Sequence, residues 1–166
     1  KITMPDMIGK KLNEEFNKQI VEEIHSAYIY MGMGAWAESK GLHKFAAFMN
    51  IHAKKEEFKH AMKFVKYIQE AGGNVEYGAI GAASVEYKDI EDVLNAAIKH
   101  EQHISARIKL LYELALEEKE YYAIEMLTWF LEEQMEEENL FEELLTSYIL
   151  TGKKDGYWDH RVRHPE

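Results

Sequence analysis

The sequence predicts an all-α fold, a four-helix bundle with one long crossover between the second and third helices. Between Pro5 and Pro165 no proline interrupts the 166-residue chain, so proline breaks no helix in that interval. Glycines divide it into stretches of roughly 30 residues, about 45 Å of helix each at the α-helical rise. Each stretch carries an apolar stripe at alternating spacings of three and four, the pattern by which helices pack in a bundle.

Glycine stop signals give the bounds of the first two helices. The first is expected to begin around residues 3–5, with Pro5 in its first turn, and to end at Lys40 before a glycine. The second is expected to run from residue 42 or 43 to Ala71, where a Gly-Gly pair follows.

A long connection is expected before the last two helices. Residues 74–88 (NVEYGAIGAASVEYK) are rich in glycine and small residues and show no helical stripe. Asp89 is expected to cap the third helix, with Asp92 in the acidic position of a capping box. That helix should end near Glu118, and the fourth should run from there to Gly152. Because the turns within each pair are short, both pairs are antiparallel and the connection leads back along the bundle.

The composition limits the expected cellular compartment and the classes of binding partner. The chain has no cysteine, which excludes disulfides and thiolate sites and makes a reducing cytoplasm the default compartment. No run approaches the roughly 20 apolar residues of a membrane span. A net charge of −10 argues against nucleic acid and favours small cations. We expect one cytoplasmic domain, residues 1–152, followed by a short polar tail, residues 153–166.

Polar side chains interrupt the apolar stripe once on each expected helix. The interrupting residues are Glu23, Glu57, His60, Glu101, Gln134 and Glu137. Counted from the tight turns, they lie about 15–19 residues along their helices, so they share one level near the middle of the bundle. The alternative is that they are solvated positions beside the stripe, because the chain has 30 acidic residues. Their coincidence in depth favours one common site.

Buried carboxylates at one level require a compensating charge. They repel one another and are costly to desolvate unless they are protonated or neutralised by a cation. Glu57 and His60, three residues apart, project from one helix face and can share a metal. Oxygen ligands with a single imidazole suit ferrous, ferric or manganese ions, whereas zinc usually takes more histidine or cysteine.

Four segments, in order along the chain, carry a resemblance to a known family. They are residues 23–30 (EIHSAYIY), 56–61 (EEFKHA), 99–102 (KHEQ) and 129–138 (WFLEEQMEEE). Together they resemble prokaryotic non-haem ferritins, which are ferritin-like di-iron four-helix bundles, and the similarity covers roughly residues 5–152. The resemblance implies a ferroxidase that oxidises ferrous iron with dioxygen or hydrogen peroxide. It also implies storage of the ferric mineral inside a homo-oligomeric, 24-subunit shell.

The resemblance further implies a role for each site residue. Glu23, Glu57 and His60 would bind the first iron, with Glu57 bridging to the second. Glu101 would bind the second iron. Gln134 would lie beside it and contact the iron or bound dioxygen.

Five more residues match positions around the family's centre. Tyr30 matches a tyrosine that the family keeps next to the centre, and a plain core tyrosine is the alternative. A third iron site is implied by Glu56, Glu133, Glu136 and Glu137. The alternative for these is that part of the dense acidic run simply faces water.

The sequence also departs from relatives of this family. Bacterioferritins and rubrerythrin-like proteins have a second Glu-x-x-His on the fourth helix, where residues 133–136 read EQME. Phe58 occupies the position of the bacterioferritin haem methionine, so no haem is expected. The family's short fifth helix, which lines a four-fold pore of the shell, is replaced here by a charged tail with only Tyr157, Trp158 and Val162 to bury, so the sequence predicts neither that pore nor the size of the shell.

Seven histidines lie outside the expected ligand set. Surface or helix-contact roles are expected for His25, His43, His52, His100 and His103. His160 and His164, spaced i, i+4, could bind metal, but the expected role is that of plain parts of the polar tail. Two other functions stay open: a di-manganese or di-iron oxidase or peroxide-removing protein without storage, and a non-catalytic helical bundle that binds partner proteins.

Overall fold

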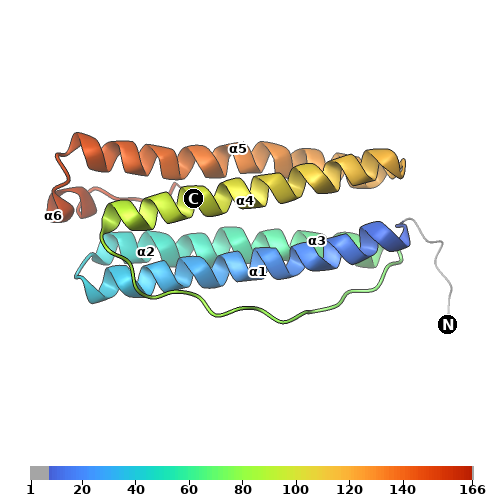
Figure 1. Ribbon diagram of the computed structural model, residues 1–166, viewed down its shortest axis with the longest axis horizontal. Helices are drawn as coiled ribbons and strands as arrows, with labels where there is room; N and C mark the ends of the chain where they lie inside the picture. Colours follow the sequence, from blue (N-terminus) through green and yellow to red (C-terminus); the bar gives the residue numbers. More distant parts are fainter. Residues whose placement is uncertain (1–7, 166) are drawn as a thin grey trace.

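The computed structural model describes residues 8–165, and over these residues the chain is all-helical (Figure 1). Four long helical segments lie side by side in a bundle, and a short helix follows them. In chain order the elements are α1 (Lys10–Ser39), α2 (His43–Ile51), the π-helical η1 (His52–Glu57), α3 (Phe58–Glu70), α4 (Ile90–Glu117), α5 (Tyr121–Leu150) and α6 (Asp155–Asp159). The predicted four-helix bundle with one long crossover is confirmed, with α2, η1 and α3 forming its second member.

The long connection between the second and third members of the bundle contains no helix. It runs as an extended strap along α1 (Figure 1). Asn17 on α1 fastens one end of it, because its Nδ2 donates to the Asn74 carbonyl at 2.7 Å and its Oδ1 accepts the Glu76 N–H at 2.7 Å. Farther along α1, a Cβ on Gly32 would overlap with the carbonyl oxygen of Ser84 in the strap. Only glycine therefore allows so close an approach.

The ends of two helices test the predicted bounds. Asp89 caps α4 as expected, accepting the Asp92 N–H at 2.8 Å, while Asp92 accepts the Lys88 N–H at 2.9 Å. The predicted start of the first helix is wrong within the described residues. Gly9 is extended (φ −71°, ψ 157°) and its N–H donates to Glu120 Oε1 at 2.9 Å, so α1 begins at Lys10. Residues 3–5, where the start was predicted, lie outside the described part of the chain.

The apolar core forms two clusters, one on each side of the bundle's middle. One cluster contains Phe16, Phe64 and Phe130, with the rings of Phe64 and Phe130 stacked at 4.5 Å. The other contains Tyr30 and Phe141, whose rings stack with centroids 5.2 Å apart. Between the two clusters lies the level at which the polar residues interrupt the stripes.

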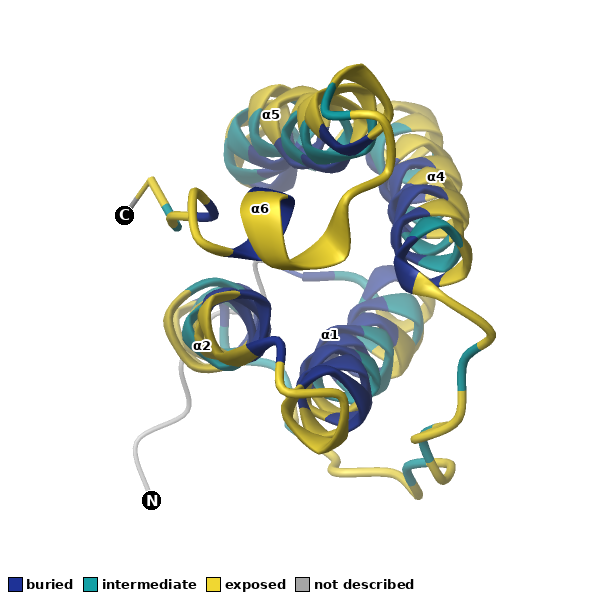
Figure 2. Cartoon of the chain, turned by 90° about the vertical axis from the view of Figure 1, so that its left-hand side faces the viewer, coloured by how far each residue is buried: buried dark blue, intermediate teal, exposed yellow. Residues whose placement is uncertain are grey.

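The C-terminal tail packs across one end of the bundle, with α6 lying between α2 and α5 (Figure 2). Trp158 is buried and its Nε1 donates to Ser147 Oγ on α5 at 2.8 Å. Asp159 Oδ1 accepts the Phe45 N–H at 2.8 Å, in the first turn of α2. Val162 is also buried, whereas Tyr157 is half exposed. The tail is thus fixed to both hairpins of the bundle. No helix in the described residues has the length and apolarity to cross a membrane.

Candidate metal centre

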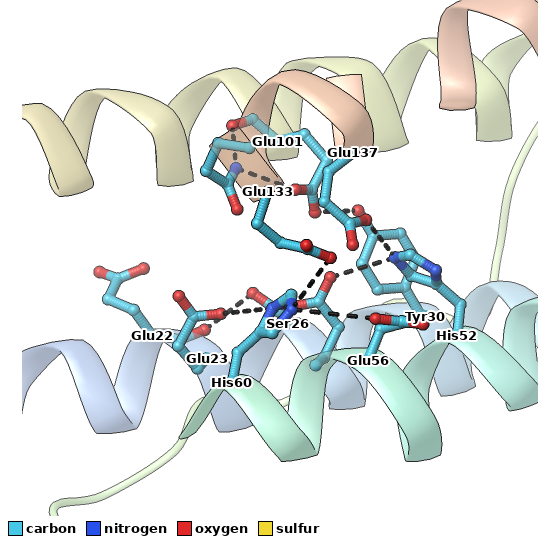
Figure 3. Close-up of polar contacts among 12 residues, drawn as sticks. Glu22, Glu23, Ser26, Tyr30, His52, Glu56, His60, Glu101, Glu133 and Glu137 are labelled. Atoms are coloured by element: carbon cyan, nitrogen blue, oxygen red, sulfur yellow. Dashed lines mark hydrogen bonds and ion pairs between the residues drawn. The ribbon is translucent and has the colours of Figure 1, made fainter. Parts of the chain in front are cut away.

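The residues that interrupt the apolar stripes converge in the middle of the bundle (Figure 3). None of them has more than 4% of its surface exposed; they are Glu23 from α1, Glu57 from η1, His60 from α3, Glu101 from α4, and Gln134 and Glu137 from α5. Their shared level agrees with the depth counted from the turns. The reading of these residues as solvated positions beside the stripe does not fit their burial.

A π-helical turn shapes the second member of the bundle at this level. Residues His52–Glu57 form η1, between α2 and α3. A π turn brings residues five apart onto one face, which an α-helix does not. His52 Nε2 accordingly lies 3.2 Å from Glu57 Oε1.

His52, for which a surface or helix-contact role is expected from the sequence, is instead a buried member of the centre. Its side chain is fully buried, and its Nε2 also lies 2.7 Å from Glu137 Oε2 on α5. At α-helical spacing, His52 does not fall on the apolar stripe that contains Glu57. The π turn places His52 on the same face as Glu57, and the residue pattern contains no signal for this turn. The other histidines assigned surface or helix-contact roles lie outside the candidate ligand groups: His25, His43, His100 and His103.

His60 sits among carboxylates without a hydrogen-bond partner for either ring nitrogen. Its Nδ1 lies 3.5 Å from Glu57 Oε2 and 3.8 Å from Glu23 Oε2. Its Nε2 lies 3.6 Å from Glu133 Oε1 and 3.9 Å from Glu56 Oε2. Buried polar groups normally have a hydrogen-bond partner. Where one has none, a site for a bound ion is one explanation. These spacings leave room for a cation between the imidazole and the carboxylates.

Glu101 is held by neighbours on two other helices. The Tyr30 hydroxyl donates to its Oε1 at 2.6 Å, and Gln134 Nε2 donates to its Oε2 at 3.1 Å. Gln134 also donates to Ser105 Oγ at 3.2 Å. Tyr30 therefore has a polar contact with the centre in addition to its stacking in the core.

The electrostatics favour proton uptake at some carboxylates and ionisation at another. Burial raises the pKa of Glu23 to about 8, and the charge of Glu57 adds to the effect. Burial likewise raises the pKa of Glu101 well above its ordinary value. Burial alone would raise the pKa of Glu57, but the hydrogen bond from His52 and the adjacent imidazole of His60 outweigh it and lower that pKa. The centre thus holds protons that an incoming cation would displace.

Three groups of candidate ligands occupy adjacent positions, each with atoms within 4.8 Å of one another. The groups are Glu23, Glu57 and His60; His52, Glu57, Glu101 and Glu137; and Glu56, His60, Glu133 and Glu137. The groups share members, so neighbouring cations would share ligands. Each group combines carboxylates with one imidazole, the donor set that suits ferrous or manganese ions.

The residues expected at a third iron site are only partly brought together. Glu56, Glu133 and Glu137 belong to one group, whereas Glu136 is exposed and belongs to none of them. All four nevertheless line one pocket of about 260 Å³, together with His52, Leu140, His164 and Pro165. His164, assigned to the polar tail, thus reaches the edge of the centre.

Comparisons with known proteins agree with this geometry. A bacterial non-haem ferritin of Staphylococcus aureus is 35% identical over 136 residues, which is 82% of this chain and 81% of that protein. The structure of an open-pore ferritin from the hyperthermophilic archaeon Archaeoglobus fulgidus superposes with a TM-score of 0.88 at 30% identity, covering 95% of this chain and 99% of the other. An engineered closed form of the A. fulgidus ferritin gives a TM-score of 0.87 at 31% identity, covering 93% and 98%.

The comparison with protein families supplies the last observation. Residues 13–149 match the ferritin-like domain, and this stretch contains every candidate ligand in the three groups. The expected resemblance is confirmed. With its bundle, its crossover and its mid-bundle carboxylates, the chain belongs to the ferritin-like domain family.

Proposed function

We propose that this chain is the subunit of an iron-storage protein that oxidises ferrous iron at the mid-bundle centre. The observation that carries the proposal is the buried His60, which lacks a hydrogen-bond partner and has carboxylates of three other helical elements around it. An imidazole in that position is suited to bind a cation rather than to stabilise the bundle.

In this proposal the ferrous ions are the substrate. Glu23, Glu57 and His60 would bind one ion, and Glu101 would bind the other, with Glu57 shared because it belongs to both groups. Two ferrous ions each give up one electron, and dioxygen takes up both electrons and two protons to leave as hydrogen peroxide. Carboxylates stabilise the ferric products, and the surrounding apolar clusters keep the site dry. Gln134 and Tyr30 would hold Glu101 in place.

Storage requires a route out of the centre and an enclosed volume. The pocket lined by Glu56, Glu133, Glu136 and Glu137 would hold a third iron on that route. The similar solved proteins are ferritins, which supports assembly of this chain into a homo-oligomeric shell, proposed here as 24 subunits in the cytoplasm. Phe58 leaves no methionine for haem at the corresponding position, so the proposal includes no haem.

The test is anaerobic ferrous loading followed by exposure to air. We expect ultraviolet ferric absorbance to rise quickly in the natural protein and in a Glu132→Ala control, since Glu132 is exposed. We expect Glu57→Ala to lose most of this rise, because the residue belongs to two ligand groups. A natural protein no faster than Glu57→Ala would rule out the ferroxidase. A companion measurement of light scattering separates a shell from a dimer.

A di-manganese or di-iron oxidase or peroxide-removing protein without storage is the second candidate. The donor set favours it as well, because carboxylates with imidazole also suit manganese. Metal analysis of protein purified without added iron distinguishes the two, since manganese at the centre would support the second candidate. The non-catalytic bundle predicts no thermal shift with ferrous iron.

A further inference from the structure

The C-terminal tail brings a histidine to the edge of the metal centre. Asp159 and Val162 anchor the tail to the end of the bundle. Beyond them the chain turns along the bundle until the His164 ring packs on Phe48, with centroids 4.7 Å apart. The fold thus gives a terminal residue a fixed place beside η1.

His164 meets His52 at the opening of the acidic pocket. Its Nε2 lies 3.0 Å from His52 Nδ1, on the side of the His52 ring away from Glu137. His52 is fully buried, whereas His164 is partly exposed. The pair therefore connects the buried centre with the surface, 112 residues apart in sequence.

We propose that His52 and His164 bind a divalent first-row metal ion at the mouth of this pocket, a transit site that the tail completes. Two nitrogen ligands at about 2.1 Å from one ion and at right angles to each other lie ~3.0 Å apart, the separation found here. Carboxylates of Glu136 and Glu137 line the same pocket and supply negative charge. A nearby observation also indicates cation binding: the buried ring nitrogens of His60 have no hydrogen-bond partner, and Nε2 faces pocket-lining Glu56 and Glu133.

The identity of the physiological ion, ferrous iron, rests on the proposed function. The presence of the site does not, because imidazole and carboxylate ligands bind cobalt or zinc through the same atoms. The competing explanation is that the two rings only share a hydrogen bond that fastens the tail. A probe that reports nitrogen ligation separates the two.

The experiment is a titration of the metal-free protein with Co²⁺, followed by calorimetry and by visible absorption. We expect His164→Ala to bind one Co²⁺ fewer per subunit than the natural protein and to lose part of the visible band. His160→Ala is the matched control, because His160 is exposed on the same tail and does not line the pocket. It should bind as the natural protein does. His164→Gln keeps a hydrogen-bonding side chain but removes the imidazole, and it should behave like His164→Ala.

Three outcomes would overturn the proposal. They are an unchanged Co²⁺ count in His164→Ala, equal losses in His160→Ala and His164→Ala, and full binding by His164→Gln. The remaining Co²⁺ sites serve as the internal check that the bundle has folded. A Glu101→Ala protein should still lose one Co²⁺ when His164 is replaced. Failure of the ferroxidase therefore leaves this result standing, and loss of this site leaves the ferroxidase standing.

Discussion

The hydroxyl of Tyr30 and the carboxyl group of Glu101 are joined by a hydrogen bond of 2.6 Å across the middle of the bundle. The same Tyr30 ring stacks on Phe141 and meets His52 edge-on, with centroids 4.9 Å apart. Packing thus fixes the ring, and the ring fixes one oxygen of Glu101. A core residue in this position determines where a proposed metal ligand lies.

Tyr30→Phe should weaken both the fold and the oxidation of iron. Loss of one buried hydrogen bond is expected to lower the free energy of unfolding by about 1 kcal/mol, and Glu101 would be held less firmly because Oε1 loses its donor while Gln134 still donates to Oε2. Urea unfolding and the initial rate of ferric absorbance measure the two effects. Tyr28→Phe is the control, because Tyr28 lies on the same helix with 48% of its surface exposed. Equal rates in Tyr30→Phe and the natural protein would contradict the positioning role.

The stability of the metal-free protein should fall as the pH rises toward 8. The pKa of Glu23 is about 8 in the folded protein, against an ordinary value of 4.5. The folded state therefore binds this proton more tightly than the unfolded state does. The resulting stabilisation is lost as the pH rises from the lower to the higher of these two pKa values. Between pH 6 and pH 8 this contribution to the free energy of unfolding falls by about 2 kcal/mol. Glu23→Gln, which keeps an acceptor for Gln19, should show a shallower fall in urea unfolding at the two pH values. A slope identical to that of the natural protein would refute the assignment.

Glu133→Ala should remove the ion nearest the pocket while the first step of oxidation persists. Glu133 lies 3.6 Å from His60 Nε2, on the side of that ring opposite Glu23. Its loss affects one ligand group and leaves the other two intact. Counting the iron oxidised in the first burst measures the change, with exposed Glu132→Ala as the control. A burst of the same size in both variants would place the third ion elsewhere.

Gly32→Ala should displace the strap from α1. The new Cβ would overlap with the Ser84 carbonyl oxygen, which belongs to the backbone and cannot rotate away. We expect a loss of about 1–3 kcal/mol, typical of overpacking, visible as a lower Tm. Gly156→Ala is the matched control, because a Cβ there meets nothing within 4 Å. A Tm for Gly32→Ala as high as that of the control would show that the strap is not tightly held.

Much of the fold could be predicted from local signals in the sequence. The glycine stops and the Asp89 cap act within a few residues, so they determine most helix ends without knowledge of the fold. The level of the site followed from counting along helices of known rise. By contrast, the start of α1 depends on the contact between Gly9 and Glu120, which is distant in sequence.

The missed features of the site arise from backbone irregularity and from long-range packing. The π turn His52–Glu57 alters the periodicity on which the stripe was drawn, so His52 was counted on the wrong face. The docking of the tail depends on Asp159 meeting the first turn of α2 and on Trp158 reaching α5. Neither contact has a counterpart in the residue pattern of the tail itself.

The strap has a consequence for how the protein can be divided. It joins one helical hairpin, which contributes Glu23, Glu57 and His60, to another, which contributes Glu101 and Glu137. A chain cut between residues 74 and 88 would yield a first fragment that keeps the group Glu23, Glu57 and His60 whole, while the other two groups would be divided between the fragments. Cation uptake beyond that of the first fragment alone would then report whether the two fragments associate, which makes this bundle a candidate for a split-protein sensor.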